Sequence, residues 1–557
     1  MFKDEVLKEI EQLNAEYKKN INKVLKKFSI DEEKDLTTLS GLPLKSLYTP
    51  VDIQNTSYIE DISFPGVFPF TRGVSPTGYR TKEWTVRQVM GLGTAEETNE
   101  RLKYLLKQGQ TGFSVCGMGY QPYESDDERT IGILGRGGVW IDTLADIEDM
   151  FRDIDMSKIS INQIGFSIPI FAMILTEAER QCVEYKDLSG TIQNCVYPLG
   201  DGSDTRGNGA VDIIEFCTKK LPRWNHTSIS VRNLRDEGIS AFEEIAFGIY
   251  YGLFTLKSAM TRGIEVDEIA PRISFFLSSE NDFLEEVAKF RAMRRLWARI
   301  IKDEYNARNP ASWLMRFHVQ TTALNLTAQQ PLNNIIRSSI HALAAVLGGA
   351  QSMSVNSFDE ALAIPTEASA TLSLRTQQII ANETGVSDVI DPLGGSYCIE
   401  ALTNQLEQKA VEVLKQLNDM QPDKAYDYIY NHAREAGYKR QKAIDANEMP
   451  VVGVNRYMSE GEGDGVDFSN VDLFGYNPEW REKQIGRLNK VKSERDETQV
   501  ERAKKHLEEA YRDKVNIIEP VIEAVKAYLS IGEIVKVREK VYGPANLDHV
   551  MGCYFGM

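Results

Sequence analysis

The sequence predicts an α/β protein whose largest part is a (β/α)8 barrel, or TIM barrel, with a helical and extended arm before it and a helical extension after it. From about residue 85 onward, short β-like runs alternate with stretches of helix length, which is the order that produces a parallel sheet. The chain has 557 residues, more than one ordinary core contains. One large domain with additions therefore fits its length.

The arm is expected over residues 1–50. Its first part repeats apolar side chains at helical spacing, with Lys and Glu on the opposite face, which predicts a helix over residues 3–28 docked on a neighbour. The apolar positions are Val6, Ile10, Leu13, Tyr17, Ile21, Val24 and Phe28. A polar, extended stretch then follows, marked by Pro43, Pro50, Pro65 and Pro69.

The barrel is expected over residues 51–420, where eight β-like runs can be assigned. They cover residues 111–117, 159–165, 189–194, 227–231, 272–278, 314–320, 351–357 and 387–393. Between the fifth and sixth runs an amphipathic helix is expected, because apolar residues recur on one side. These residues are Phe283, Val287, Phe290, Trp297 and Ile301. The pattern is least regular over residues 350–400.

One face of several predicted strands is small and polar, whereas barrel strands usually point bulky branched side chains inward. The polar residues occur in pairs: Ser160 and Asn162, Ser228 and Ser230, His318 and Gln320, Ser352 and Ser354. Short hydroxyl and amide groups cannot fill a barrel centre by apolar packing, and they need hydrogen-bond partners when buried. They predict either a lumen threaded by a long polar ligand, or hydrogen bonds to neighbouring strands and waters.

The extension is expected over residues 421–557, where the pattern is helical and strongly charged. Residues 494–514 are typical of a solvated or linking helix. Residues 517–543 are more amphipathic, so we expect them to pack on the barrel or on a partner.

Composition excludes several function classes. The net charge of −17 at pH 7 argues against a nucleic-acid partner, because phosphate binding usually needs a basic face. No run of about 18 apolar residues predicts a membrane span, and the start of the chain lacks the layout of a secretory signal. The 6 cysteines form no C-x-x-C pair, which predicts reduced cytoplasmic thiols and no metal site.

Several long blocks carry a family resemblance. The densest are EIAPRISFF (268–276), DPLGGSYCIEALTN (391–404) and the stretch 337–369. Shorter blocks in the same order are residues 39–50, 70–73, 84–88 and 189–194. From residue 39 to about 543 the chain resembles the large subunit of the methylmalonyl-CoA mutase family. Its layout is similar to the two-subunit isobutyryl-CoA and 2-hydroxyisobutyryl-CoA mutases.

The resemblance implies an activity: an adenosylcobalamin-dependent acyl-CoA mutase, which is an isomerase that works through radicals. In the family, coenzyme A threads the barrel axis and adenosylcobalamin lies over one mouth. The cobalt–carbon bond breaks homolytically, the adenosyl radical removes a substrate hydrogen, the thioester group migrates, and the hydrogen returns. The cofactor supplies this chemistry, while the protein orients the substrate and excludes side reactions.

The resemblance also implies partners. The family's cobalamin domain follows the barrel and carries D-x-H-x-x-G, whereas residues 548–552 read DHVMG with Asp and His adjacent. A cobalamin domain needs about 100 residues, more than follow this motif. We therefore expect no cobalamin-binding domain here, and adenosylcobalamin bound largely by a separate small subunit. A homodimer of large subunits and a GTPase chaperone are further implied partners.

The family's binding residues can be carried over where the motifs match. Positions that contact the coenzyme A ester correspond to Thr77, Thr85, Arg87, Ser114, Arg272 and Ser274. Each arginine could instead be a structural ion-pair partner, although its planar fork suits a phosphate or carboxylate. The glutamine that reaches the acyl group corresponds to Gln193, and residues at the junction of substrate and cofactor correspond to His318 and Gln320.

Two of these residues have a plain structural alternative. A lone histidine in a strand is usually a satisfied core residue, but His318 shares its polar face with Gln320. Glu360 matches a glutamate near the adenosyl ribose, and its alternative is an acid at a helix N-terminus, where the helix dipole favours negative charge.

Departures from the family pattern concern the acyl group. Val89 stands where methylmalonyl-type enzymes have a tyrosine, and residues 195–212 lack the arginine that holds a free carboxylate. Methylmalonyl-CoA is therefore a poor substrate candidate, because a buried carboxylate without its partner is costly. Arg206 or Arg232 could hold an acidic group instead. The loop that contains Gly117 replaces a bulkier one.

Further departures concern the chemistry itself. Arg232 and Asn233 replace the family's tyrosine and histidine, and Leu324 replaces a tryptophan near the corrin. Asn233 can donate a hydrogen bond but cannot act as an acid. The first hypothesis is an active mutase with a different acyl group. The alternative is a non-catalytic paralogue that binds a coenzyme A ester or is a scaffold for another mutase subunit. An altered reaction, such as heteroatom migration, also remains open.

Overall fold

Short parallel strands form a closed ring in the computed structural model, which describes residues 2–28, 36–117, 123–165, 167–196, 205–458 and 473–544. Two five-stranded sheets have the orders β1-β10-β9-β8-β7 and β2-β3-β4-β5-β6. β1 (Thr85–Arg87) and β2 (Val89–Met90) are successive parts of one extended stretch, as are β6 (Trp224–Asn225) and β7 (Thr227–Ser230). The sheets therefore join at both edges, and the predicted (β/α)8 barrel is confirmed.

The other strands are β3 (Gly112–Val115), β4 (Ser160–Gln163), β5 (Ser189–Ile192), β8 (Ile273–Ser279), β9 (Arg316–Thr321) and β10 (Ser352–Ser354). The helices up to β10 are α1 (Asp4–Lys27), α2 (Ala95–Lys107), α3 (Leu144–Met150), α4 (Ile168–Arg180), α5 (Thr205–Lys220), α6 (Arg232–Glu237), α7 (Ala241–Met260), α8 (Val266–Ile269), α9 (Phe283–Arg299) and α10 (Asn333–Leu347). Those after it are α11 (Glu367–Glu383), α12 (Tyr397–Asn418), α13 (Pro422–Asp445), α14 (Glu479–Glu494), α15 (Glu497–Asp513), α16 (Ile518–Lys526) and α17 (Ile531–Tyr542).

Seven of the eight predicted β-like runs contain a strand, and the eighth is wrong. Residues 387–393 lie in turns between α11 and α12. The apolar side chain of Val389 is 58% exposed, so burial does not stabilise a strand there. Asp391 instead holds this turn in place by accepting hydrogen bonds from Arg72 (2.8 Å) and Arg291 (2.7 Å). The eighth strand of the barrel is instead the extended stretch that contains both β1 and β2.

The strands present two different faces. Their outward side chains are buried under the surrounding helices and form the main core, for example Ile161, Ile229, Phe275, Phe317 and Met353. α7 and α9 approach closely over this face, because a Cβ on Gly252 would meet Phe275 at 3.2 Å and Trp297 at 3.1 Å. The side chains that point inward belong to the small, polar face of the strands predicted from the sequence.

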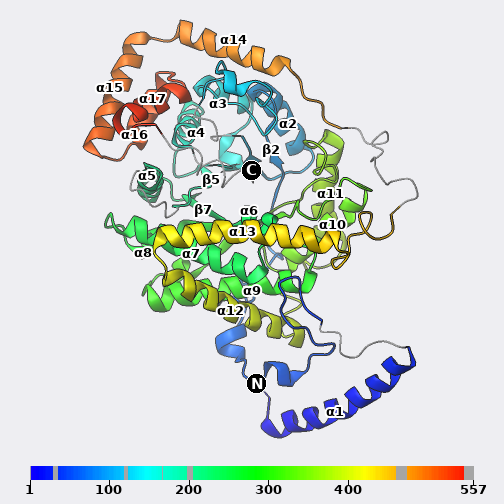
Figure 1. Ribbon diagram of the computed structural model, residues 1–557. Helices are drawn as coiled ribbons and strands as arrows, with labels where there is room; N and C mark the ends of the chain where they lie inside the picture. Colours follow the sequence, from blue (N-terminus) through cyan, green and yellow to red (C-terminus); the bar gives the residue numbers. More distant parts are fainter. Residues whose placement is uncertain are drawn as a thin grey trace.

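The predicted amphipathic helix is α9, and its apolar side is buried as expected. Val287, Phe290 and Trp297 are all at most 1% exposed. Its other sides are also covered, so its charged residues need internal partners. Lys289 donates to Glu244 at 2.6 Å, and neither side chain is exposed. α7 and α12 pack along α9 in the lower half of the molecule (Figure 1).

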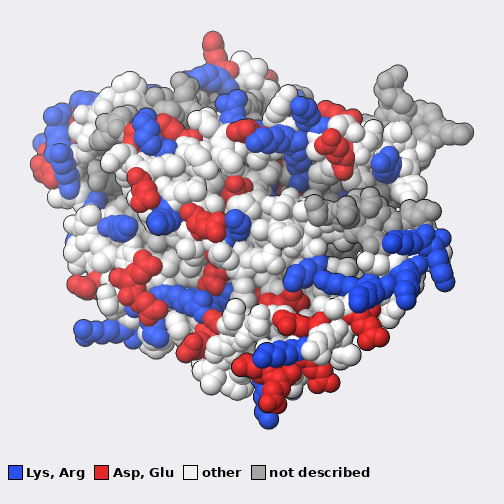
Figure 2. Space-filling view, turned by 60° about the horizontal axis from the view of Figure 1, so that its bottom comes forward, with Lys and Arg blue, Asp and Glu red and all other residues white. Residues whose placement is uncertain are grey.

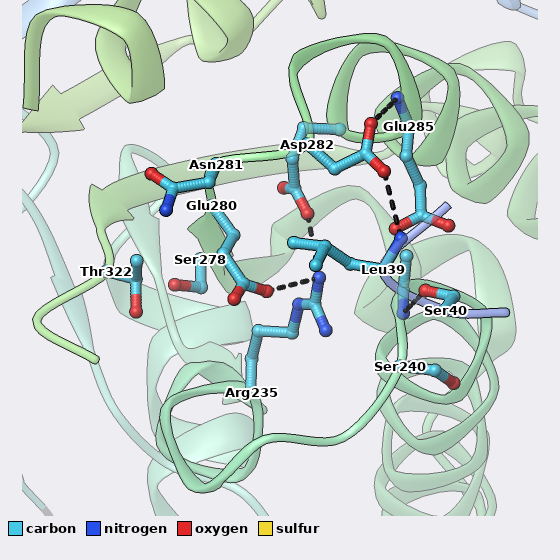
Figure 3. A network of polar contacts seen from close by, with 12 residues as sticks. Leu39, Ser40, Arg235, Ser240, Ser278, Glu280, Asn281, Asp282, Glu285 and Thr322 are labelled. Carbon is cyan, nitrogen blue, oxygen red and sulfur yellow. Dashed lines mark hydrogen bonds and ion pairs between the residues drawn. The ribbon is translucent and has the colours of Figure 1, made fainter. Parts of the chain in front are cut away.

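The arm is tied to the barrel helices just after the residues that the structure omits. Leu39 donates its backbone N–H to Asp282 (2.9 Å), and the hydroxyl of Ser40 accepts the N–H of Ala241 (2.8 Å). Figure 3 shows this contact beside the buried ion pair of Arg235 with Glu280. Ser40 thus accepts an N–H at the start of α7, and Leu39 donates to Asp282, the N-cap residue of α9.

The first helix of the arm forms as predicted, but only its start packs on the rest of this chain. α1 extends away from the body of the molecule (Figure 1), and Leu7 is its one buried residue. Leu13 and Val24 are 58% and 52% exposed. Figure 2 shows basic side chains gathered along the outer half of α1, where the sequence has Lys18, Lys19, Lys23, Lys26 and Lys27.

The extension begins with α13, which crosses the molecule beside α6, and from α14 onward it wraps around the barrel on the side of α2, α3 and α4 (Figure 1). The segment predicted to pack on the barrel forms α16 and α17, and α16 packs on α4 with Val521 and Val525 buried. α15 is less solvated than expected, since it buries Val500 and Leu507. No described helix has the length and apolarity needed to cross a bilayer.

Candidate functional site

A cavity of about 510 Å³ runs into the barrel lumen from the amino-terminal ends of the strands. Its strand lining is mostly polar: Thr85, Arg87, Ser160, Asn162, Ser189, Thr191, Asn225, Ser228, Ser274, His318 and Ser352. The predicted polar lumen is therefore present. Some lining groups also bond to one another, as Asn225 does to Thr191 (3.1 Å), which is the second of the two interpretations of the polar faces, while a threaded ligand stays a prediction.

Strand register arranges these side chains in layers. Thr85 is level with Ser352, which is level with His318, which is level with Phe276. On the other half of the barrel, Ser114 is level with Asn162 and Thr191. Because alternate residues of a strand face the same side, each layer places several polar groups around the axis at one height.

Arg87 lies along the wall of the lumen as a buried cation, against Gly112 of β3. Its guanidinium donates to Ser352 Oγ (2.9 Å), to Ser160 O (2.9 Å) and to Ser160 Oγ (2.7 Å). It forms no ion pair with any described carboxylate, so the structural ion-pair alternative is wrong for this residue. Burial lowers the pKa of Arg87 to about 10. A buried cation without a counter-ion favours a ligand that is anionic or rich in acceptors.

A second group of arginines lies at the amino-terminal mouth of the cavity: Arg223, Arg272 and Arg316. Burial lowers the pKa of Arg272, and Arg223 lowers it further. Burial likewise lowers the pKa of Arg316, and Arg272 adds to this. Like charges held together are unfavourable without an anion between them. Of these three arginines, only Arg272 was predicted from the sequence as a binding residue. Arg316 could also have been predicted, because it stands two residues before His318 on the same polar face of the strand.

His318 lies halfway along the lumen as a neutral imidazole. Its Nδ1 is 2.8 Å from Ser352 Oγ, and its Nε2 is 3.2 Å from Ser354 Oγ. Burial holds its pKa well below the ordinary value, and the charges of Arg87 and Arg232 lower it further. The ring of Phe276 lies 5.0 Å away between centroids. Both ring nitrogens have serine partners, so His318 positions hydrogen bonds and is not an acid at neutral pH.

The carboxyl-terminal mouth holds the amides predicted to reach the acyl group. Gln193 follows β5, is 5% exposed, and accepts the N–H of Gly165 at 3.2 Å. Its Nε2 is buried and has no partner among the described residues. Gln320 donates to Asn356 at 2.6 Å. A buried amide donor without an acceptor costs about 1–3 kcal/mol, so Gln193 is prepared for a ligand oxygen.

Charged groups surround the same mouth. Arg232 is 2.7 Å from Asp236 and donates to the side-chain oxygen of Asn233 at 3.2 Å. Glu360 lies in a turn after β10, not at a helix N-terminus, because α11 begins at Glu367. Burial raises the pKa of Glu360 to about 7, while Arg232 opposes this shift.

The remaining predicted residues lie around the cavity. Thr77 is outside its lining, but its hydroxyl is 2.7 Å from that of Thr81, which lines it. Val89 is level with Ser114, whose hydroxyl accepts from Asn162 at 3.2 Å.

Gly117 and Leu324 lie at the carboxyl-terminal mouth. Gly117 has φ +88° and packs on the backbone at Gly138, 2.6 Å from where its Cβ would lie. Leu324 is half-buried and donates its N–H to Thr322 (3.1 Å). The side chain of Arg206 lies outside the described residues.

Comparison with known proteins agrees with this geometry. The profile of the methylmalonyl-CoA mutase family matches residues 37–544. The chain belongs to the methylmalonyl-CoA mutase family. As a member of a family of mutases it is an isomerase, an intramolecular transferase.

Individual relatives in the mutase family differ in length. The 2-hydroxyisobutanoyl-CoA mutase large subunit of Aquincola tertiaricarbonis is 40% identical over 543 residues, which are 92% of this chain and 93% of that protein. The methylmalonyl-CoA mutase of Cereibacter sphaeroides is 37% identical over 524 residues, 91% of this chain and 72% of that protein. The human mitochondrial methylmalonyl-CoA mutase is 37% identical over 538 residues, 93% of this chain and 70% of that protein.

Proposed function

We propose that this chain is the coenzyme A ester-binding catalytic subunit of an adenosylcobalamin-dependent acyl-CoA mutase. The observation that carries this is the polar lumen, in which Arg87 is a buried cation without a described carboxylate partner. The cavity runs inward from three arginines at one mouth to Arg87 and His318, and the unpaired amide donor of Gln193 lies beyond its lining at the other mouth. A long ligand with anionic groups at one end and an acyl group at the other matches this order.

Coenzyme A would enter from the amino-terminal mouth. Its phosphates would lie at Arg223, Arg272 and Arg316, because guanidinium groups bind phosphate through two N–H donors at once. The amide-bearing arm would follow the lumen past Arg87 and Ser274. Its length would bring the thioester to the carboxyl-terminal mouth, near His318 and Gln193.

Adenosylcobalamin would lie over the carboxyl-terminal mouth, where barrel enzymes have their active sites. The residues there fit it: Leu324 offers a half-buried apolar side chain to a flat macrocycle, and Glu360 and Gln320 offer oxygens to ribose hydroxyls. When bound, the cofactor would supply the radical chemistry of hydrogen removal and return. The residues of this chain would orient the acyl group and exclude water.

The acyl group differs from methylmalonyl in this proposal. Val89 is smaller than the tyrosine of methylmalonyl-type enzymes, and its strand partner Ser114 is also small. The first relative is named for 2-hydroxyisobutanoyl-CoA, a branched ester without a free carboxylate. A branched, uncharged acyl group is therefore the preferred candidate class.

Partners and organisation follow from the same relatives and from the surface. The name "large subunit" of one relative supports a small, cobalamin-binding subunit for this chain as well. A second copy of the chain would cover the exposed apolar side of α1, including Leu13 and Val24. A GTPase chaperone is the third proposed partner. None of the five described cysteines is in a disulfide, which supports the proposed cytoplasmic location.

The division into an arm (1–50), a barrel (51–420) and an extension (421–557) also remains a proposal, and the end of α12 at Asn418 supports the second boundary.

The function is tested by product analysis. The purified chain is mixed with its small subunit, adenosylcobalamin and a panel of branched, hydroxylated, dicarboxylic and aromatic acyl-CoA esters. Mass spectrometry and chromatography then look for an isomer of each ester. An isomer from at least one ester is the expected result. Tight binding of esters and small subunit with no isomer from any ester would favour the non-catalytic paralogue, which the replacements at Asn233 and Leu324 suggest.

A further inference from the structure

Arg232 lies at the carboxyl-terminal mouth of the barrel, near Phe276 of β8. It is the first residue of α6, directly after β7. Its guanidinium carbon is 6.0 Å from the ring centroid of Phe276, which lines the lumen. Burial raises the pKa of Cys116 after β3, and Arg232 acts against that shift. Arg232 therefore lies at the carboxyl-terminal end of the strands, beside the ring of Phe276 of β8.

The helix that carries Arg232 is fixed from two directions. Asp236, one turn later, pairs with Arg232 at 2.7 Å and accepts hydrogen bonds from Thr322 (2.6 Å) and Ser278 (3.3 Å). Behind the helix, Arg235 pairs with the buried Glu280 at 2.6 Å, as Figure 3 shows. A short helix held at both faces keeps its side chains in place before a ligand arrives, which is what an effective site requires.

Arg232 also keeps unused donor capacity. One terminal nitrogen pairs with Asp236, and the other donates to the side-chain oxygen of Asn233 at 3.2 Å. Its Nε is buried and has no partner among the described residues. Leaving a buried donor unpaired is unfavourable, because the group has lost its water partners without gaining a protein one. An oxygen of the ligand that accepts this N–H would remove that cost.

We propose that Arg232 donates a hydrogen bond to the thioester carbonyl oxygen of the bound acyl-CoA, and that the acyl group carries no charge. This rests on the proposed function. A guanidinium carries N–H donors and no acceptor, so Arg232 stabilises negative charge on the carbonyl oxygen through a hydrogen bond. Asp236 already neutralises Arg232, and Glu360 lies nearby, so a carboxylate on the acyl group would meet two acids with one paired cation.

The experiment compares two ligands that differ in the carbonyl alone. Isobutyryl-CoA is a thioester, and isobutyl-CoA is the matching thioether with CH₂ in place of C=O. Isothermal titration calorimetry measures both with the full-length chain. The wild type is expected to bind the thioester about tenfold or more tightly than the thioether, which corresponds to about 1.4 kcal/mol for one hydrogen bond from a charged donor.

Arg232→Met removes the donors and keeps much of the side-chain volume. The expected result is a thioester-to-thioether ratio near one, with the affinity for the thioether unchanged and part of the ratio restored in Arg232→Lys. Arg512→Met, which changes an arginine on α15 paired with Glu508, is the control and should keep the ratio. The unfolding temperature of each variant checks that it is folded.

Three results would overturn parts of this account. A ratio that stays at tenfold in Arg232→Met would assign the carbonyl contact to another residue. An equal loss of affinity for both ligands in Arg232→Met would show that Arg232 has a structural role at the carboxyl-terminal mouth. Methylmalonyl-CoA binding more tightly than isobutyryl-CoA, with this preference lost in Arg232→Met, would assign Arg232 to a carboxylate. Failure of the wild type to bind either ligand would instead contradict the proposed function itself.

Discussion

Arg87 of β1 donates to both the backbone oxygen (2.9 Å) and the hydroxyl (2.7 Å) of Ser160 in β4. Only β3 lies between these two strands, and the guanidinium lies against it, because a Cβ on Gly112 would be 2.9 Å from Arg87 Cζ. This contact therefore follows the wall of the lumen. It holds a cation in the lumen with no described carboxylate beside it, and it provides the first prediction.

Arg87→Met should weaken binding of coenzyme A to the full-length chain by about 10- to 100-fold, because hydrogen bonds from a charged donor contribute about 1.5–3 kcal/mol. Arg512→Met on the outer helix α15 is the matched control and should leave the affinity unchanged. Calorimetric titration with free coenzyme A measures both. Unaltered affinity in Arg87→Met would place the ligand outside the lumen.

Gln193→Met should separate stability from binding. The buried Nε2 of Gln193 has no described partner, but its Oε1 accepts the N–H of Gly165, so an apolar side chain of similar length should lower the free energy of unfolding by no more than about 1–3 kcal/mol. The same change should weaken the binding of isobutyryl-CoA about tenfold, whereas the affinity for free coenzyme A should stay the same. Chemical denaturation measures the free energy of unfolding, and calorimetric titration measures the affinity for each ligand. A large loss of stability would show that Gln193 is satisfied within the folded chain.

Buried histidines should make the protein less stable in mild acid. Burial lowers the pKa of His226 to about 3 and of His341 to about 4, and it holds that of His318 well below the ordinary value. An unfolded chain binds protons at these residues below about pH 6.5, whereas the folded chain does not. The free energy of unfolding should therefore fall as the pH falls below about 6.5, by up to about 1.4 kcal/mol per pH unit for each histidine.

Denaturant unfolding at pH 7.5, 6.5 and 5.5 checks this dependence. His341→Gln should reduce the slope, because the imidazole of His341 is replaced by an amide that can still meet Asn281. The control is His506→Gln on the exposed face of α15, which should keep the slope of the wild type. An identical slope in all three proteins would show that these rings do not set the acid limit.

Gln484 should anchor the extension in a pH-dependent way. Its amide donates to Asp142 (2.9 Å) and Asp146 (3.0 Å), and all three side chains are buried. Burial raises the pKa of Asp142, and the neighbouring Asp146 raises it further. The protonated form is thus favoured in the folded state, so its contribution is present at low pH and is lost as the pH rises through the folded pKa.

Hydrogen exchange across α14 should therefore be slow at pH 6 and faster at pH 8, after correction for the intrinsic exchange rate. Asp142→Asn should remove this dependence, because an amide cannot lose its proton in that range. Gln484→Ala should speed exchange in α14 at both pH values. Equal protection at pH 6 and pH 8 in the wild type would contradict the raised pKa of Asp142.

Much of the fold could be predicted from the sequence, because two patterns indicated the same architecture. Alternation of β-like and helical runs predicted the barrel, and polar pairs such as Ser160 with Asn162 predicted its lumen. The prediction of a strand at 387–393 failed because Val389 and Ile390 form a short apolar run that is not covered by a helix. β1 and β2 were missed as a strand, since Arg87 and Gln88 break the apolar pattern.

Parts of the site depended on three-dimensional contacts that no local pattern contains. The cluster of Arg223, Arg272 and Arg316 combines residues from three strand starts, so their proximity follows only from the closed ring. The direction of Arg232 was left open by the sequence, and it depends on the ion pair with Asp236 and on the buried anchor of Arg235. Likewise, only the structure shows that α1 leaves its apolar side uncovered.

The central claim is that this chain takes part in the radical rearrangement and is not only a binding subunit. The most direct measurement is deuterium transfer: the chain, its small subunit and adenosylcobalamin are incubated with isobutyryl-CoA deuterated in its methyl groups, and the cofactor is analysed by mass spectrometry. Deuterium in the adenosyl group, together with a straight-chain product, is the predicted result. An unlabelled cofactor with isobutyryl-CoA and with deuterated forms of the whole ester panel, despite saturated binding, would contradict the account.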